Sequence, residues 1–343
     1  MNLLEYREEL RKNRNSRSTT HVVNPVGSTV CTYPTKLTAG DFLRFNVTNT
    51  TTATKHTGTM LTYTFPVDCE VIIYAVGARG GKGNKCTDEQ VGKGANAQGV
   101  FNFKKGDTLL MCVGQAGTDF SGSYSDGATG AGGGGTFVCL KMENGIGSTY
   151  TGSGVGNGWV IKPILIGAGG NGGRDVGYSS SGTIYHGQGF GGSSPTYATY
   201  SGGGFAYSHT TTNAGETFLS GASGATANYT RSSTSYAGFG CGGGNKDDGE
   251  GGGGGGYHGG TLTVSAYSYI DTELAGLYHS IAGDNFGEGY IEIEFMQISG
   301  ASVRANVNGT WKESKEVKVN VNDTWKDAKQ IFVNVNGTWK ESI

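Results

Sequence analysis

The sequence has no long apolar run, and it contains few charged residues and few prolines. No stretch approaches the roughly 20 apolar residues that a helix needs to span a bilayer, so we expect no membrane insertion. Charged residues make up 16% of the 343 residues and the formal net charge is -2, which excludes a strongly basic surface for nucleic acid. The N-terminal sequence MNLLEYREEL carries charges where a secretory signal needs an apolar core, so we expect synthesis in a cytoplasm.

The motifs of several enzyme classes are also missing. There is no Walker A sequence, no Gly-x-Ser-x-Gly elbow and no HExxH pair, and the six histidines are scattered. The six cysteines are widely spaced without a CxxC pair, so we expect buried free thiols rather than a zinc or redox site. These cysteines are Cys31, Cys69, Cys86, Cys112, Cys139 and Cys241. The sequence therefore predicts a protein that is not an enzyme.

One acidic cluster is a candidate metal site. Asp247, Asp248 and Glu250 lie within a glycine-rich stretch, where a turning backbone and carboxylate oxygens could hold a calcium ion. Their spacing differs from that of an EF-hand loop. A solvated acidic loop is the alternative interpretation, and we expect no other cofactor.

Glycine is the most unusual component, with 64 residues, and residues 251–256 are an unbroken glycine run. Such a run cannot form an ordinary helix or strand interior, because glycine loses the most backbone freedom on ordering and buries no side chain. A flexible linker is one interpretation. The other is a bundle of extended threefold helices of the polyproline II kind, bonded to one another through their main chains. Further tracts that such a bundle needs occur at residues 77–83, 130–135, 167–173, 187–192 and 202–204.

Apolar segments adjoin several of these tracts. Residues 71–76 precede one tract, residues 163–166 precede another, and residues 136–140 follow a third. A linker has no reason to be joined directly to core strands, so this arrangement favours the ordered bundle. Many short β-prone segments and little helical pattern predict an antiparallel β sandwich. Residues 29–297 are the expected extent of this glycine-rich domain.

Several dissimilar motifs follow one another in a recognisable order. They are VIIYAVGARGGKG at 71–83, GQAG at 114–117, GGGGTF at 132–137, PILIGAGGNGGR at 163–174, GGGGGGYHGG at 251–260 and GEGYIEI at 287–293. Together they resemble the glycine-rich domain of the anaplastic lymphoma kinase and leukocyte tyrosine kinase receptors. The resemblance implies a tumour-necrosis-factor-like β sandwich with an inserted bundle of polyglycine helices. In the receptors this domain binds a cytokine, but this sequence shows no kinase region, so the ligand does not carry over.

The two ends of the chain have compositions of their own. Residues 1–28 begin with a weak helical stripe of Leu3, Tyr6 and Leu10, which predicts a short helix to about Arg14. This segment is either a docking peptide for other virion proteins or a frayed terminus. Residues 298–343 contain three copies of a Val-Asn-(Gly/Asp)-Thr-Trp-Lys motif with tryptophans every 14 positions. Their Asn-Gly and Asn-Asp pairs predict β-hairpins, and the repeats resemble those that end bacteriophage structural proteins.

Aromatic residues are the candidate binding groups. Tyrosines placed among Gly, Ser and Thr resemble the contact surfaces of antibody loops, although they could instead cap the glycine bundle. The tryptophans of the repeats also have two interpretations, which are contact with a glycan and packing within the protein. The candidates are Tyr178, Tyr185, Tyr197, Tyr200, Tyr207, Tyr229, Tyr236, Trp311, Trp325 and Trp339.

The sequence predicts a bacteriophage virion protein, most simply a tail fibre or spike that attaches to a host cell-surface glycan or protein. We expect a homo-oligomer, by analogy a trimer, that is located in the virion and binds neither nucleic acid nor membrane. An architectural capsid or baseplate decoration is the first alternative. A bacterial surface adhesin is the second.

Overall fold

The computed structural model forms two units, residues Met1–Gln297 and Ile298–Ile343, which are described separately. It describes residues 2–12, 18–83, 87–120, 129–143, 146–173, 186–190, 202–206, 214–227, 235–244, 251–261 and 264–298, and six strands between 304 and 341. No helix in these parts is long and apolar enough to cross a membrane.

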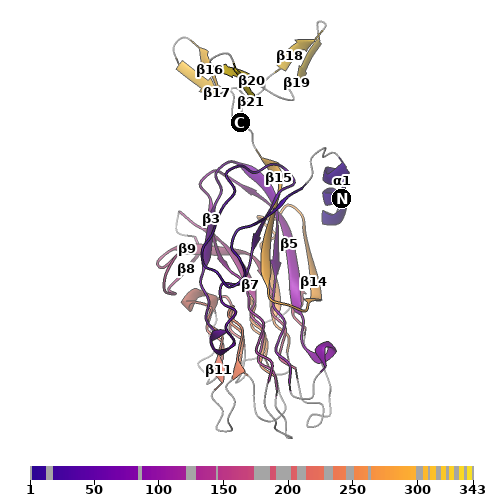
Figure 1. The fold of residues 1–343 in the computed structure, drawn as a ribbon, viewed down its shortest axis with the longest axis vertical. Coiled ribbons are helices and arrows are strands. Elements are labelled where there is room, and N and C mark those ends of the chain that lie inside the picture. The colour runs from indigo at the N-terminus through magenta and orange to yellow at the C-terminus, as the bar shows by residue number, and fades with distance from the viewer. Residues whose placement is uncertain are drawn as a thin grey trace. The chain divides into compact units, whose positions relative to one another are not determined.

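Two sheets form a sandwich in the first unit (Figure 1). The first sheet has the order β1 (Thr20–Val22), β2 (Phe42–Phe45), β15 (Tyr290–Ile298), β4 (Cys69–Val76), β5 (Gly94–Phe103) and β14 (Tyr278–Asn285). The second has the order β10 (Gln188–Phe190), β13 (Tyr267–Ile270), β9 (Val160–Gly167), β7 (Thr136–Lys141), β6 (Thr108–Cys112) and β3 (Leu61–Thr64), with β8 (Ser148–Thr149) beside β9. Most pairs are antiparallel, whereas β1–β2 and β10–β13 are parallel. The predicted all-β sandwich is confirmed.

The centre of each sheet is covered on both faces, since β4 and β6 are buried at successive residues, whereas β14 at the edge of the first sheet is mostly exposed. Stacked rings of Phe65 and Phe103, 4.2 Å apart, contribute to the apolar core of the sandwich. On the second sheet, Phe137 packs with Phe218 in an additional cluster. Shorter elements complete this unit: the 3-10 turns η1 (Thr52–Thr54), η2 (Asp88–Gln90) and η3 (Phe218–Ser220), and the hairpin of β11 (Thr226–Ala227) and β12 (Ser235–Tyr236).

The predicted N-terminal helix is present as α1 (Leu3–Lys12), and its expected end at about Arg14 lies outside the described residues. It begins with a reciprocal cap, because Asn2 Oδ1 accepts from the Glu5 N–H and Glu5 Oε2 accepts from the Asn2 N–H. Leu3 is buried against Ile72 and Val100 of the first sheet. The predicted docking segment is therefore anchored on the domain, by this helix and by the pairing of β1 with β2.

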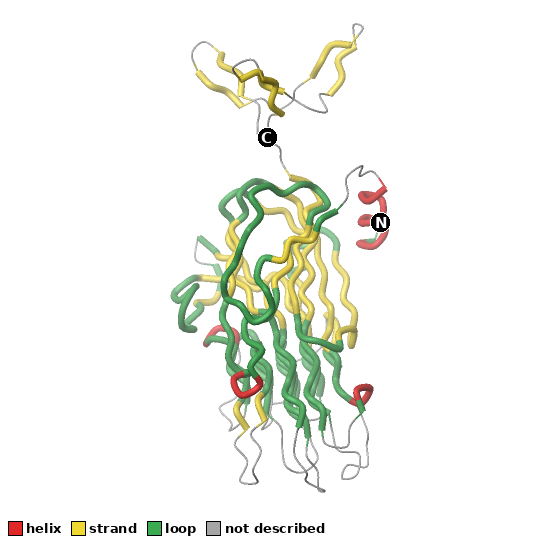
Figure 2. The backbone as a smooth tube through the Cα atoms, in the orientation of Figure 1, coloured by secondary structure: helices red, strands yellow, loops and turns green. Residues whose placement is uncertain are grey.

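The glycine tracts run alongside one another beyond the sheets, as extended segments without α-helix or strand pairing (Figure 2). We use the name glycine bundle for residues 77–83, 114–118, 130–135, 167–173, 240–244 and 251–256. Main-chain hydrogen bonds join these segments laterally to one another and to residues 92–95, and donors three residues apart reach the same neighbour. In each bond the N–H of the first residue donates to the carbonyl of the second. The pairs of bonds are Gly77 to Ala95 with Gly80 to Gly92; Ala78 to Gly134 with Gly81 to Ala131; Gly130 to Gly173 with Gly133 to Gly170; Gly132 to Gly243 with Gly135 to Gly240; and Gly169 to Gly255 with Gly172 to Gly252.

A repeat of three residues distinguishes these segments from a strand, which repeats every two residues, and from an α-helix, which repeats every 3.6. It is the repeat of a polyproline II helix, which leaves the backbone groups free to bond with neighbours. The described tracts are thus ordered, with their buried N–H and C=O groups paired as burial requires. No bundle of α-helices occurs in the described part of the chain.

Close approach of the tracts explains why their residues are glycine. A Cβ atom added at Gly134 would lie 1.7 Å from the Phe239 carbonyl oxygen, and one added at Gly130 would lie 1.8 Å from that of Gly81. Alanine occurs where its methyl group meets other methyl groups, as in the buried cluster of Ala95, Ala168 and Ala266. Any larger side chain at the glycine positions would force the tracts apart and break their lateral bonds.

The described residues of the second unit form three β-hairpins, as predicted. They pair β16 (Arg304–Val307) with β17 (Thr310–Glu313), β18 (Lys318–Val321) with β19 (Thr324–Asp327), and β20 (Phe332–Val335) with β21 (Thr338–Glu341). Each tryptophan lies opposite an asparagine, as Trp311 does opposite Asn306. The three sequence repeats therefore form hairpins with the same strand register.

The close approach of the tracts can be tested by one substitution and a matched control. We expect Gly134→Ala to lower the free energy of unfolding by more than about 3 kcal/mol, because the methyl group cannot fit. Gly276→Ala should change it by less than about 1 kcal/mol, because nothing lies within 4 Å of an added Cβ there. Urea denaturation of both variants measures the difference. Equal, small effects would contradict tight packing of the tracts.

Candidate binding site

The tract ends remote from the sheets lie together, and we name them the bundle end. The Gly130 N–H donates to the Gly173 carbonyl, the Gly252 N–H donates to the Gly130 carbonyl, and the Phe120 N–H donates to the Lys82 carbonyl. Residues 121–128, 174–185 and 245–250 follow or precede these ends in the chain. Those three segments are therefore attached at one place on the protein.

Tyr236 is the one tyrosine among the predicted binding residues that the structure describes. Its main chain exchanges two hydrogen bonds with Thr118 of the bundle, at 3.0 Å and 2.8 Å. Its ring is partly buried and stacks on His56, with the ring centroids 5.0 Å apart. Tyr236 therefore packs against the side of the bundle, which is the capping role that the sequence left open.

The remaining predictions have different outcomes. Trp311, Trp325 and Trp339 lie on hairpin strands of the second unit. Outside the described residues lie Tyr178, Tyr185, Tyr197, Tyr200, Tyr207, Tyr229, Asp247, Asp248 and Glu250. Among the described residues, no group of three His, Cys, Asp or Glu side chains is placed to hold a metal ion. The calcium site stays a prediction.

Of the cysteines, Cys69, Cys112, Cys139 and Cys241 are buried free thiols, as expected, while Cys31 is partly exposed. Burial raises the pKa of Cys112, Cys139 and Cys241 well above the usual range. These thiols therefore serve as small apolar groups in the core. Cys86 lies outside the described residues.

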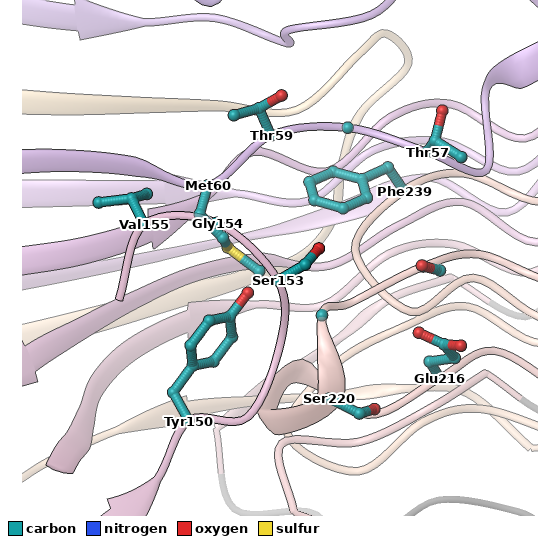
Figure 3. Close-up of a pocket in the computed structure, with 13 residues that line it drawn as sticks. Thr57, Thr59, Met60, Tyr150, Ser153, Gly154, Val155, Glu216, Ser220 and Phe239 are labelled. Carbon is teal, nitrogen blue, oxygen red and sulfur yellow. The ribbon is translucent and has the colours of Figure 1, made fainter. Parts of the chain in front are cut away.

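A cleft of about 420 Å³ lies where the second sheet meets the glycine bundle (Figure 3). Four chain segments line it: residues 57–60, 150–155 and 216–223, and Phe239. Met60, Tyr150 and Phe239 are buried and provide its apolar part. Gly58 makes room for the Phe239 ring, because an added Cβ would lie 2.4 Å from the ring.

Polar groups enter the cleft from two sides. The Tyr150 hydroxyl points into it toward Met60 and Ser153, and the Glu216 side chain lies on the other side (Figure 3). Tyr150 is 1% exposed, and its hydroxyl forms no hydrogen bond with a described residue. Burial raises the pKa of Tyr150, so the hydroxyl keeps its proton. Glu216 is exposed and forms no ion pair within the described residues.

Three serines add hydroxyl groups to the lining, from Ser153, Ser220 and Ser223. Ser220 is already bonded to Thr217, at 2.8 Å between their hydroxyl oxygens. Among the described residues, the lining has one carboxylate and no histidine, cysteine or lysine. It offers hydrogen bonds around an apolar floor, the usual composition of a small-molecule binding site.

The sequence-based prediction missed this cleft. Tyr150 and Phe239 look like core residues in the sequence, and nothing in their spacing joins them. Glu216 had one available signal, because it is the only acidic residue between Asp175 and Asp247. An isolated acid in a long stretch without other acidic residues is a reason to examine that residue as a functional group.

The chain matches no protein-family model and no curated protein sequence.

The packing of His56 against Tyr236 predicts a pH dependence. Burial lowers the pKa of His56 in the folded protein, whereas the unfolded chain binds a proton near pH 6.5. The stability that comes from this difference is present above about pH 6.5 and is lost as the pH falls toward 5. We expect His56→Gln to weaken this fall, measured by urea denaturation between pH 7 and pH 5.

His279→Gln controls for the loss of a histidine, since its side chain is exposed. It should leave the pH dependence as it is in the unmodified protein. Identical curves for the unmodified chain and His56→Gln would show that the stacked ring is not desolvated.

Proposed function

We propose that the chain is a non-enzymatic bacteriophage virion protein of the tail fibre or spike type, which attaches the particle to the surface of a host cell. The observation that carries this proposal is the convergence of the bundle end. Three segments that lie far apart in the sequence are anchored there by hydrogen bonds between Gly130, Gly173 and Gly252 and between Phe120 and Lys82.

Lateral bonding makes the anchors of these segments rigid. Each tract is held by main-chain hydrogen bonds to neighbours on more than one side, so its end cannot swing as a linker does. Fixed anchors reduce the ordering cost of binding. A stiff support for short segments suits a protein that must bind at a distance from its own sheets.

The composition of the attached segments supports recognition of a surface. Residues 174–185 read RDVGYSSSGTIY and residues 228–234 read NYTRSST. The second segment joins β11 to β12, and β12 is bonded to Thr118 of the bundle. Tyrosine supplies contact area with few rotatable bonds, while Ser, Gly and Asn supply adaptable hydrogen bonds. The proposed partner is a host cell-surface glycan or protein.

The proposal is tested by binding of the fluorescently labelled full chain to a panel of bacterial strains. On a strain that binds, we expect Tyr178→Ser combined with Tyr229→Ser to weaken attachment at least about tenfold, as loss of aromatic contacts does at other interfaces. Tyr278→Ser is the matched control. Tyr278 is the first residue of β14, whereas Asn285 at the other end of that strand pairs with Gly94 beside the bundle. It should bind as the unmodified chain does.

A second full-length variant with Trp311→Ala, Trp325→Ala and Trp339→Ala separates the repeats from the bundle end. Attachment should persist in this variant. Loss of attachment only in the tryptophan variant would place recognition on the repeats, contrary to the proposal. Lack of binding to every strain by the unmodified chain would contradict attachment altogether.

A further inference from the structure

The cleft described above has polar groups that form no hydrogen bond with the described residues. Tyr150 is almost completely buried, yet its hydroxyl forms no hydrogen bond with a described residue and is aimed into the cleft (Figure 3). Although the ring is buried, the hydroxyl opens onto the cleft, where solvent or a ligand can bond to it. The hydroxyl is therefore available to a ligand that enters the cleft.

The charge of the lining restricts what that ligand can be. Glu216 is the only charged residue in the part of the cleft lining that the structure describes. The nearby Lys55 is engaged elsewhere, since its Nζ lies 3.0 Å from Glu288 Oε1. A carboxylate accepts hydrogen bonds and repels anions. The cleft therefore favours a neutral ligand that donates hydrogen bonds, and it disfavours phosphates, sulfates and uronic acids.

The remaining lining fits a ligand with both polar edges and apolar faces. The hydroxyls of Ser153 and Ser223 lie beside the apolar floor made by Met60 and Phe239. A pyranose ring combines C–H faces with hydroxyl groups at its edge, and adjacent hydroxyls can donate together to the two oxygens of one carboxylate. The volume of about 420 Å³ is in the range of small-ligand pockets.

We propose that the cleft lined by Tyr150, Glu216 and Phe239 binds a neutral hexopyranose, with the Glu216 carboxylate accepting from two ring hydroxyls and the Tyr150 hydroxyl bonding to the sugar. This site is separate from the bundle end. The proposal does not depend on attachment to a cell, because binding of a free sugar to the isolated protein is sufficient to show it.

Saturation-transfer NMR of the full chain tests the proposal with the methyl α-pyranosides of glucose, galactose and mannose, and with glucuronate as the anionic counterpart. We expect saturation transfer to at least one neutral pyranoside and none to glucuronate. Tyr150→Phe should weaken binding about fivefold and Glu216→Gln about tenfold or more, the effects expected for losing a neutral and a charged hydrogen bond.

Two matched controls separate these roles from general effects on the fold. Tyr63→Phe removes another buried tyrosine hydroxyl that lacks a hydrogen-bond partner, and Tyr63 lies outside the cleft lining. Glu273→Gln removes an exposed carboxylate, with its side chain 87% exposed. Both should bind the sugar as the unmodified chain does. Thermal unfolding of all four variants establishes that they fold.

Three results would overturn the proposal. No saturation transfer to any of the three pyranosides would show that the cleft is not a hexose site. Equal binding by the unmodified chain, Tyr150→Phe and Glu216→Gln would place the sugar elsewhere. Stronger binding of glucuronate than of the neutral pyranosides would show that the charge argument is wrong.

Discussion

Lateral main-chain hydrogen bonding between glycine tracts is the interaction on which the rest of the first unit depends. Bonds from residues 130–135 reach the tracts at 167–173 and 240–244, with a repeat of three residues. At many glycine positions the approach leaves no room for a side chain, as the 1.7 Å position of an added Cβ at Gly134 shows. Glycine is thus the structural residue here, although isolated glycines destabilise helices and strands.

The bundle extends directly from the sandwich, and this continuity positions both candidate sites. Residues 130–135 lead into β7, and β9 leads into residues 167–173. The strand ends therefore set where these tracts lie beside one another. At the near end, Phe239 and Glu216 are brought against Tyr150 to form the cleft. At the far end, the same tracts hold the segments proposed to contact a cell surface. One set of main-chain bonds therefore supports two surfaces of different chemistry.

The sequence was sufficient to predict the sandwich, the N-terminal helix, the hairpin repeats and the order of the glycine tracts, because each leaves a local pattern. Alternating or continuous apolar runs mark strands, and tracts joined to those runs mark the bundle. The cleft leaves no local pattern, since Met60, Tyr150, Glu216 and Phe239 come from four separate segments. Sequence also left the role of Tyr236 open between binding and capping, and only its stacking on His56 shows the packing. The likeness to the receptor glycine-rich domain stays a prediction.

Amide hydrogen exchange of the intact protein, read at residues 130–135, 167–173 and 251–256, tests the account most directly. If the lateral bonds hold the tracts together, their amides will exchange as slowly as those of β4 and β5, because both require the domain to open. Exchange of these glycine amides at the rate of an unstructured peptide, while β4 and β5 stay protected, would contradict the account and show that the tracts are flexible linkers.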